Sequence, residues 1–481
     1  GMLTADRMAA VDANAAALGV PRKQLMESSG NAVARVVRQY VDPDDRVILV
    51  CGRGNNGGDA FVAARFLKDY DVEVALLGHP DRIGTDIARQ NWAALQTAEI
   101  PTTTITDSTA IDDLDLAGAD CIVDAMLGTG VTGALREPTA TAARAITAAD
   151  TAVVAVDVPS GVDADTGEAA GDAVTADHVV TFHDTKPGLD ALDAAVTVAD
   201  IGIPAAAERF VGPGDLLGRE RAAESHKGDH GELLVIGGGP YTGAPALAGQ
   251  AALQAGADLV HVACPESVAP QVQGYSENLI VHPLAGELVT RSVVDDLLTQ
   301  ATAVDAVVCG PGLGDSESTR AAVGAFLERY DGRAVVDADA LSVVPEVDTG
   351  ATLVCTPHQG EVVEMGGPSA DDREQLADQI SDFAADLGHT LLVKRAHDII
   401  SDGETTRINR TGNPGMTVGG TGDVLAGVVG ALLATEEPRS AAAVGAYVTG
   451  RAGDLAADTV GDSLVATDLL DRLPKVFATD E

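Results

Sequence analysis

Short apolar runs rich in β-branched residues alternate along the chain with longer, alanine-rich stretches of helical periodicity. Such alternation predicts parallel β-sheets covered by α-helices, that is, an α/β fold. In the first half, the predicted strands span residues 46–51, 72–77, 121–127, 152–158, 178–182 and 195–201.

The pattern lapses into glycine, proline and charged residues between positions 210 and 232, and a second series of strands then begins. These predicted strands span residues 232–238, 258–264, 279–284, 306–312, 334–341, 352–358 and 391–400. A break of this kind is typical of a domain boundary. We therefore predict two α/β domains, residues 2–212 and 213–481.

The chain carries 73 acidic and 31 basic residues, a formal net charge of −42. Such a chain repels nucleic acids and anionic membranes, so we expect neither as a partner. It has no apolar run of about 18 residues, the length that a membrane-spanning helix needs. Dispersed acid, few lysines and only 3% aromatic residues resemble proteins of salt-loving archaea, in which high salt screens the self-repulsion.

Each of the five cysteines lies in or beside an apolar run, and none forms a CxxC pair. This favours buried free thiols in a reducing compartment over a disulfide or metal framework. The N-terminal residues lack a secretory signal pattern, so we predict a cytoplasmic protein. We also expect a homo-oligomer, although no residue pattern gives the number of subunits.

The first predicted strand runs into a glycine turn in which Gly52, Gly54 and Gly57 satisfy GxGxxG, the dinucleotide fingerprint of Rossmann folds. A classical NAD-dependent dehydrogenase also needs an acidic residue near the end of the second strand. Glu73 lies at the start of that strand instead. The dehydrogenase interpretation is therefore disfavoured.

Polar residues follow the other predicted strands, where ligands bind in open α/β sheets. Asp124, Asp157, Ser160 and Lys186 lie at such ends, and "LGTGVTG" offers backbone amides suited to a phosphate. Asn56, Asp124 and Ser160 provide oxygen ligands for a cation. Each alone is better explained as a cap or turn residue, but their recurrence at successive strands favours a site.

Four motifs, "GRGNNGGDAFVAARFL", "DAMLGTGVTG", "VDVPSGVDADTG" and "KPGL", together resemble the NAD(P)H-hydrate epimerase family over residues 2–212. The resemblance implies a Rossmann-like three-layer αβα domain and a K⁺ ion held by Asn56, Asp124 and Ser160. It also implies dinucleotide contacts from Asn55, Asn56, Gly57, Gly58, Asp59, Gly128, Thr129, Gly130, Val131, Thr132, Gly133, Ala134 and Asp157. Ala60 and Arg53 depart from the glycine and proline usual in that family.

Inverting the C6 hydroxyl of such a hydrate requires a C–O bond to be broken and remade on the other face of the ring. Protons must move on and off the oxygen during this exchange. Our hypothesis is that Asp157 is the acid/base and that Lys186 is its charge partner or a second acid.

In the second half, "GNPGMTVGGTGDVLAG" (residues 412–427) places a glycine-dense loop before an apolar helix. It is not a P-loop, because GxxxxGK[ST] is absent. "GGTGD" resembles the ribokinase-like loop, in which amides at a helix start neutralise a phosphoryl group and the aspartate, here Asp423, takes a hydroxyl proton. Lys394 is predicted to contact phosphate, and His358 and Glu361 follow another strand.

"HKGDHGELLVIGGGPYTGAPALA", "GPGLG", "TPHQGE" and the loop at 412–427 together resemble the ADP-dependent NAD(P)H-hydrate dehydratase family, which is ribokinase-like, over residues 215–476. The resemblance implies that Ala244, Gly312, His358 and Asp423 face the hydrate, with ADP as phosphoryl donor and Mg²⁺ as cofactor. The implied nucleotide contacts are Lys394, Arg395, Ala396, His397, Asp398, Asn413, Gly419, Gly420, Thr421 and Gly422. Arg395 replaces the usual glycine, which places these contacts in doubt.

The two resemblances together imply repair of NADH hydrate and NADPH hydrate. One domain would epimerise C6, and the other would dehydrate the S epimer with ADP, giving AMP and phosphate. Two alternatives stay open: a kinase of a small hydroxymethyl compound fused to a dinucleotide-binding domain, and a non-catalytic nucleotide sensor. The preference for ADP over ATP and for NADH or NADPH hydrate is not readable from the residues.

Overall fold

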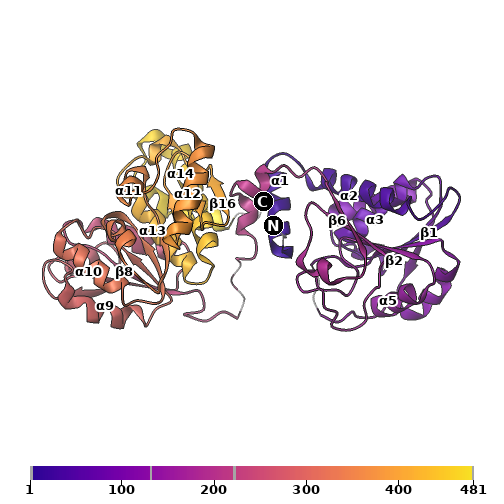
Figure 1. The fold of residues 1–481 in the computed structure, drawn as a ribbon, viewed down its shortest axis with the longest axis horizontal. Helices are drawn as coiled ribbons and strands as arrows, with labels where there is room; N and C mark the ends of the chain where they lie inside the picture. Colours follow the sequence, from indigo (N-terminus) through magenta and orange to yellow (C-terminus); the bar gives the residue numbers. More distant parts are fainter. Residues whose placement is uncertain (1–3, 131–132, 220, 222–223, 479–481) are drawn as a thin grey trace. The chain divides into compact units, whose positions relative to one another are not determined.

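The computed structural model describes all residues except 1–3, 131–132, 220, 222–223 and 479–481. The chain divides into two compact units, Gly1–Ala207 and Glu208–Glu481 (Figure 1). The division precedes the predicted boundary at 212 because Val211 packs in the second core and its amide donates to the Ile408 carbonyl oxygen at 3.0 Å. Ala207, by contrast, is buried in the first core.

The N-terminal unit is built on a seven-stranded sheet whose strand pairs are all parallel, in the order β3-β2-β1-β4-β5-β6-β7. Strand order reverses between β1 and β4, and ligands bind open α/β sheets at such a switch point. The strands are β1 Arg46–Cys51, β2 Asp71–Leu77, β3 Thr102–Ile105, β4 Cys121–Ala125, β5 Ala152–Val156, β6 His178–Phe182 and β7 Ala195–Ala199. Of these, β3 was not predicted, because "TTTI" has little apolar character.

Helices cover both faces of this sheet, as the three-layer expectation requires. Successive strand residues point to opposite faces, so Val47 and Leu49 join one core while Ile48 and Val50 join the other. Helices α1 to α4 cover the first face and α5 the second. Their bounds are α1 Ala5–Ala17, α2 Arg22–Val37, α3 Asn55–Phe66, α4 Asp86–Thr97 and α5 Thr139–Ala148, with 3₁₀ helices η1 Pro80–Arg82, η2 Ser108–Leu114, η3 Leu116–Gly118 and η4 Pro187–Ala191.

The C-terminal unit is built on a nine-stranded sheet in the order β10-β9-β8-β11-β12-β13-β14-β15-β16. It is parallel up to β14, and β15 and β16 are added antiparallel. The strands are β8 Glu232–Ile236, β9 Leu259–Pro265, β10 Ile280–Leu284, β11 Ala306–Cys309, β12 Arg333–Val336, β13 Thr352–Cys355, β14 Thr390–Val393, β15 Asp398–Ser401 and β16 Thr406–Asn409. The prediction of one strand over 391–400 is wrong: the chain turns back after Val393, and the two apolar ends of this run pair with each other.

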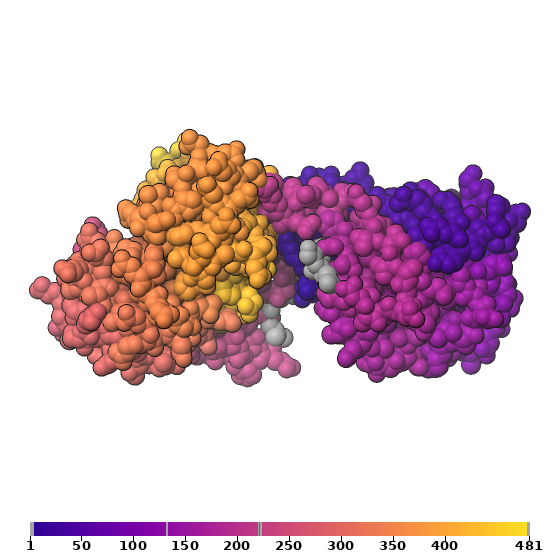
Figure 2. Space-filling view, viewed as in Figure 1, coloured from indigo at the N-terminus to yellow at the C-terminus, as the bar shows by residue number. Residues whose placement is uncertain are grey.

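The helices of this unit are α7 Gly243–Gln254, α8 Ala269–Gln273, α9 Val294–Ala301, α10 Glu317–Leu327, α11 Gln359–Glu364, α12 Arg373–Leu387, α13 Thr421–Leu433, α14 Pro438–Val460, α15 Ala466–Leu470 and α16 Leu473–Phe477. Helix α6 Ala206–Arg209 spans the division between the units, and the 3₁₀ helices are η5 Pro213–Leu216, η6 Arg291–Val293, η7 Ala338–Glu346, η8 Pro414–Met416 and η9 Gly461–Ser463. The hairpin β15–β16 contacts α12 and α14. In the space-filling view, the surface of the later part of the unit is orange to yellow (Figure 2).

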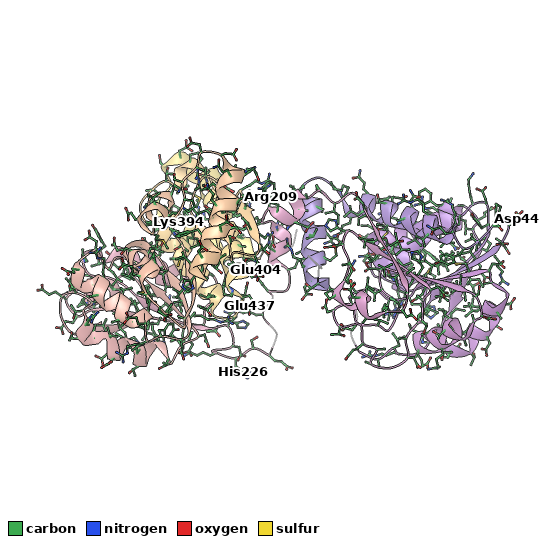
Figure 3. The ribbon with its side chains drawn as sticks, viewed as in Figure 1. Asp44, Arg209, His226, Lys394, Glu404 and Glu437 are labelled. Atoms are coloured by element: carbon green, nitrogen blue, oxygen red, sulfur yellow. The ribbon has the colours of Figure 1, made fainter. Side chains whose placement is uncertain are left out.

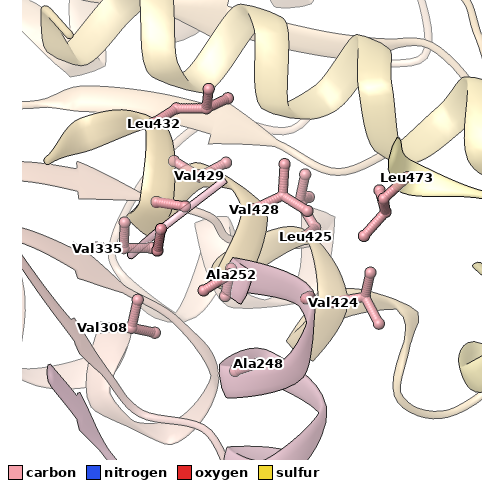
Figure 4. Close-up of a cluster of buried hydrophobic side chains, with 14 of the residues drawn as sticks. Ala248, Ala252, Val308, Val335, Val424, Leu425, Val428, Val429, Leu432 and Leu473 are labelled. Atoms are coloured by element: carbon pink, nitrogen blue, oxygen red, sulfur yellow. The ribbon is translucent and has the colours of Figure 1, made fainter. Parts of the chain in front are cut away.

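Helix α13, which follows the glycine loop, is apolar on all sides and is buried from Val424 to Leu433. It packs against the sheet residues Val308 and Val335 and against helix α7 (Figure 4). The approach is close: a Cβ atom at Gly427 would lie 2.0 Å from the Ala248 carbonyl oxygen. Glycine here lets α13 reach α7, and so fixes where the loop before it lies. No helix among the described residues is long and apolar enough to cross a membrane.

Candidate functional sites

A cavity of about 990 Å³ opens in the N-terminal unit beside the switch point of its sheet. Loops after β1, β4, β5 and β6 contribute to its lining, and so do α1 and α2. The predicted site residues that line it are Asn55, Asn56, Asp59, Gly128, Thr129, Gly130, Asp157 and Lys186. The structure therefore gathers residues from four separate sequence motifs around one space.

Among the described residues, the remaining predicted contacts do not line this cavity. A Cβ atom at Gly57 would lie 2.1 Å from the Gly52 carbonyl oxygen, and one at Gly58 would lie 2.8 Å from the Met26 side chain, so both glycines serve close packing at the start of α3. Gly133 and Ala134 lie outside the cavity lining. Val131 and Thr132 lie outside the described residues.

Asp157 and Lys186 form an ion pair in which Lys186 Nζ lies 2.8 Å from Asp157 Oδ1. The Lys186 side chain is only 1% exposed, and its Nζ also donates to Thr181 Oγ1 at 2.7 Å and to the Phe182 carbonyl oxygen at 3.1 Å. Thr181 Oγ1 in turn lies 3.1 Å from the same Asp157 oxygen. Asp157 has a positive φ of 67°, uncommon for a non-glycine residue, and its amide donates to the Val180 carbonyl oxygen. A buried ammonium thus holds one side of a carboxylate that lines the cavity.

Asn56, Asp124 and Ser160 come together around the backbone of Leu127. The fully buried Asp124 carboxylate accepts hydrogen bonds from Ser160 Oγ at 2.6 Å and from the Ser160 amide at 2.7 Å. Asn56 Nδ2 donates to the Leu127 carbonyl oxygen, and the Leu127 amide donates to Ser160 Oγ. Burial raises the pKa of Asp124 to about 6, with these hydrogen bonds opposing the rise.

These groups fit a monovalent cation. A buried carboxylate with amide, hydroxyl and carbonyl oxygens around it is an oxygen-only donor set, and a bound cation would compensate its charge. The described residues contain no group of three His, Cys, Asp or Glu side chains placed to hold a metal, which a transition-metal site would need.

Two aspartates line this cavity for which sequence analysis predicted no acid/base role. Asp12 comes from α1, and Asp59, predicted only as a contact, has a side chain almost completely buried. Burial raises the pKa of Asp12 and, more strongly, that of Asp59, and in both the neighbouring Asp157 adds to the rise. No sequence pattern indicated that Asp12 lines the cavity, because a single acid in an alanine-rich helix usually faces water.

In the C-terminal unit, Lys394 is the centre of a charged group at the ends of neighbouring strands (Figure 3). Its Nζ lies 2.8 Å from Asp337 Oδ1 and 3.9 Å from Glu361 Oε2, and Thr356 Oγ1 also donates to Asp337 Oδ1 at 2.7 Å. Burial lowers the pKa of Lys394, but Asp337, Glu361 and Asp423 together raise it above its ordinary value. Asp337 was not predicted. The pattern that could have indicated it is an aspartate directly after a strand, in a sheet whose neighbouring strands are followed by predicted site residues.

Asp423 lies in the first turn of α13, a helix that begins directly after its N-cap Gly420, whose φ is 99°. Burial raises its pKa to about 7, with the Asp337 carboxylate adding to the rise and Lys394 opposing it. A Cβ atom at Gly422 would lie 3.5 Å from Lys394 Nζ, so the ammonium adjoins the helix start. A carboxyl group that titrates near neutral pH therefore lies beside backbone amides and a cation, as phosphoryl transfer requires.

His358, predicted to face a ligand, is the N-cap of α11 and is largely exposed. Its Nδ1 accepts from the amides of Gly360 and Glu361 at 3.0 and 3.1 Å, and its backbone pairs with Lys394 across the sheet. Ala244 and Gly312 also adjoin each other, because a Cβ atom at Gly312 would lie 3.2 Å from the Ala244 Cβ.

Several of the predicted nucleotide contacts are occupied within the fold. Arg395 donates to Gln359 Oε1 at 2.8 Å, and Asn413 Nδ2 donates to Asp454 Oδ1 at 3.2 Å. Asp398 accepts from Asn409 Nδ2 at 2.9 Å, and burial raises its pKa to about 6.

The other predicted nucleotide residues lie at the turn between β14 and β15 and at the glycine loop. Thr421 Oγ1 donates to the carbonyl oxygens of Met416 and Val418 and so closes the glycine loop. Ala396 and His397 are exposed at the turn, and Gly419 has open space around it.

Comparison with known proteins assigns both units. The family described as NAD(P)H-hydrate dehydratase matches residues 233–475, and the family described as YjeF-related protein N-terminus matches residues 22–188. The bifunctional NAD(P)H-hydrate repair enzyme Nnr of Pyrobaculum aerophilum is 43% identical over 99% of this chain and 98% of its own length. Its namesake in Methanothermobacter thermautotrophicus is 42% identical over 98% and 94%.

The C-terminal unit also has a close structural relative. The crystal structure of an ADP/ATP-dependent NAD(P)H-hydrate dehydratase from Bacillus subtilis, co-crystallised with ATP and Mg²⁺, matches with a TM-score of 0.51 and 28% identity over 56% of this chain and 97% of that chain. The ribokinase-like and Rossmann-like folds expected from the sequence are thereby confirmed. The chain belongs to the family of bifunctional NAD(P)H-hydrate repair enzymes.

Proposed function

We propose that this protein restores hydrated NADH and NADPH in two steps. The N-terminal unit inverts the C6 hydroxyl of the hydrate, and the C-terminal unit dehydrates the S epimer at the expense of ADP, giving AMP and phosphate. The observation that carries this proposal is that each unit assembles a proton-transfer group where its chemistry needs one: the Asp157–Lys186 pair in the cavity, and Asp423 beside Lys394 at the start of α13.

In the N-terminal unit, Asp157 moves the proton of the C6 oxygen, and the buried Lys186 orients it and balances its charge. Thr181 fixes the same carboxylate oxygen and keeps the pair in one arrangement. The dinucleotide is held by the loops that line the cavity, with the backbone amides of Gly128, Thr129 and Gly130 toward its phosphates. The close packing of Gly57 and Gly58 at the start of α3 shapes the first of these loops.

In the C-terminal unit, Asp423 takes the proton of the C6 hydroxyl while the β-phosphoryl group of ADP is transferred to that oxygen. Amides of the loop Gly419–Gly422 and the Lys394 ammonium balance the charge on the phosphoryl group. The ring nitrogen lone pair then expels phosphate, and loss of a neighbouring proton restores the reduced nicotinamide. Ala244, Gly312 and His358 face the hydrate in this arrangement.

Mg²⁺ would be bound chiefly through the phosphates of ADP, because magnesium usually takes one or two carboxylates together with phosphate and water oxygens. When bound, it would supply positive charge to the transferring group. The carboxylates of Asp337 and Glu361, next to Lys394, are available to it or to its water ligands.

K⁺ would be held by Asn56, Asp124 and Ser160. The buried Asp124 carboxylate and its pKa of about 6 support this, since burial penalises an ionised group that no cation accompanies. The cation would supply the charge that fixes the loop containing Leu127 and Gly128 at the wall of the cavity.

The excess of acidic residues supports an origin in a salt-rich cytoplasm, where KCl screens a net charge of −42. The five buried thiols agree with a reducing compartment. Refolding against increasing KCl should give yields that rise toward molar salt, and full stability in dilute buffer would contradict the salt-rich origin. A homo-oligomer is a further prediction, checked by light scattering in the same buffers.

The decisive experiment supplies purified NADPH hydrate, as separated epimers, to the protein with ADP or ATP. Recovery of reduced-nicotinamide absorbance from both epimers supports the full scheme, whereas recovery from the S epimer alone removes the epimerase. Asp157→Asn should block the R epimer only, and Asp423→Asn should block both. A stable phosphorylated product would point to the kinase alternative, and a wild type that binds nucleotide without any turnover would point to the sensor.

A further inference from the structure

The N-terminal cavity receives a carboxyl group from α1 that the Asp157–Lys186 pair does not account for. One face of α1 lines the cavity, formed by Ala5, Asp6, Met8, Ala9 and Asp12. The neighbouring face, with Val11 and Ala15, is buried in the core, so the helix is held with Asp12 toward the cavity. A partly buried carboxyl group costs folding free energy, and such a group at a cavity wall is a candidate for a functional residue.

Neither Asp12 nor Asp59 has a hydrogen-bond or ion-pair partner for its side chain in the described part of the chain. The Asp59 residue is only 9% exposed, yet it lines the same cavity as Asp12 and Asp157. The buried cation Lys186 is already paired with Asp157. Burial and the neighbouring Asp157 carboxylate raise the pKa of both Asp12 and Asp59, so each holds its proton more readily than an exposed aspartate does.

A single acid/base group is poorly suited to epimerisation at C6, because protons must be moved on both faces of the ring. The hydroxyl leaves from one face of the ring as water, and a new water adds to the opposite face. A proton must be delivered on the first face and removed on the second, and a rigid side chain anchored on one wall reaches only one of them.

We propose that Asp12 is the second acid/base of the epimerase and acts on the ring face opposite to Asp157. This inference rests on the epimerase activity proposed above. One carboxyl group protonates the C6 hydroxyl, the C6–O bond breaks, water leaves, and the ring nitrogen lone pair forms a C=N⁺ bond. Water then attacks C6 on the other face and gives its proton to the second carboxylate.

Atoms balance in this scheme, since one water leaves, one water enters, and one proton passes from the first carboxyl group to the second. Each turnover therefore exchanges the protonation of Asp12 and Asp157. The place of Asp12 on the cavity wall suits this role, and burial, which raises the pKa of Asp12, helps this group to hold a proton that it can give. The groups whose charge acts on Asp12 are Arg22 from α2, Asp59 from α3, Asp157 after β5, and His183 and Lys186 after β6.

The test is Asp12→Asn in the full chain, with conversion of the R to the S epimer followed by chromatography. We expect a fall in kcat of at least about 100-fold, the usual contribution of an acid/base group, with KM changed little. The wild type should show a bell-shaped pH profile and the variant should lose one limb of it. Asp12→Glu, which keeps a carboxyl group, should restore part of the rate and both limbs.

Asp44→Asn is the matched control, since Asp44 is an exposed aspartate of the same unit outside the cavity lining, and it should keep the wild-type rate. Dehydration of the S epimer by the same molecules measures intact protein, and thermal unfolding checks the fold. A full epimerisation rate in Asp12→Asn, or a loss that leaves both limbs in place, overturns the inference alone. A wild type that does not epimerise overturns the proposed function, and this inference falls with it.

Discussion

The Lys394 ammonium lies 2.8 Å from the Asp337 carboxylate, and the two side chains are 20% and 3% exposed. They follow β14 and β12, strands of one parallel sheet separated only by β13, whose end carries Thr356. Removing one partner of a nearly buried ion pair leaves the other as an uncompensated charge, which costs far more than the pair itself contributes.

Lys394→Met should therefore lower the free energy of unfolding of the C-terminal unit by about 3 kcal/mol and abolish dehydration. Calorimetric melting and the absorbance assay measure the two effects. Arg395→Ala is the control, because the neighbouring Arg395 side chain is exposed and bonds only Gln359 among the described residues, and it should change stability by less than about 0.5 kcal/mol. Equal losses in the two variants would contradict the importance of the Lys394–Asp337 pair.

The pKa of about 7 for Asp423 predicts a dehydration rate that rises with pH through about 7, because the base must be ionised to accept a proton. ADP binding is measured over the same range, since a terminal phosphate also titrates near about pH 6. Asp423→Asn should lower kcat by about 100-fold or more. A rate that is constant between pH 5.5 and 8.5 would exclude Asp423 as the base.

The same carboxyl group should also make stability depend on pH. Its pKa is higher in the folded state than in the unfolded state, so its contribution is fully present below about pH 4 and is lost as pH rises through about 7. At pH 8 the free energy of unfolding of Asp423→Asn should therefore exceed that of the wild type by up to about 4 kcal/mol. This gain should vanish at low pH, where the wild-type carboxyl group is protonated in both states. A variant less stable than the wild type at pH 8 would contradict the burial of an ionised Asp423.

If K⁺ occupies the Asp124 site, KCl should stabilise the protein more than tetramethylammonium chloride at equal ionic strength. A K⁺ concentration of 100 times the dissociation constant adds about 2.7 kcal/mol to the free energy of unfolding. This gain should disappear below about pH 6 as Asp124 is protonated. Asp124→Asn should lose it. Asp44→Asn removes an equal charge at an exposed position (Figure 3) and should keep it.

Gly427→Ala should disrupt the contact between α13 and α7, because its Cβ would lie 2.0 Å from the backbone oxygen of Ala248. We expect a loss of at least about 2 kcal/mol in unfolding free energy. Gly324→Ala, within α10 where the new Cβ would lie 3.7 Å from Val347 Cγ2, should instead gain about 0.5–1 kcal/mol. Similar melting temperatures for the two variants would contradict the close approach of these helices.

Sequence reasoning located the strand-end residues well, for a physical reason. Parallel strands bring their carboxyl ends to one edge of a sheet, so Asp157 and Lys186, read as neighbours from their motifs, are in contact. Asp337 obeys the same rule but was passed over, because no resemblance drew attention to its motif. Asp12 could not be placed, since only tertiary packing decides which face of α1 meets the cavity.

The hairpin after Val393 shows a second limit of pattern analysis. Residues 391–400 form one run with apolar ends, and nothing local distinguishes a long strand from two short antiparallel ones. The turn is held by a local bond from the Arg395 amide to Asp398 Oδ1 and by two contacts from elsewhere: Asn409 on β16 donates to Asp398, and the Arg395 guanidinium bonds Gln359. Strand length therefore depends on distant residues as well as on those of the strand.

The capping role of His358 limits what this side chain can offer a ligand. Its Nδ1 is committed as an acceptor to two backbone amides, so the proton of the neutral ring resides on Nε2. The imidazole can then give a hydrogen bond to a bound molecule but cannot accept one. His358 therefore favours a ligand that presents a hydrogen-bond acceptor at this position over one that presents only a donor.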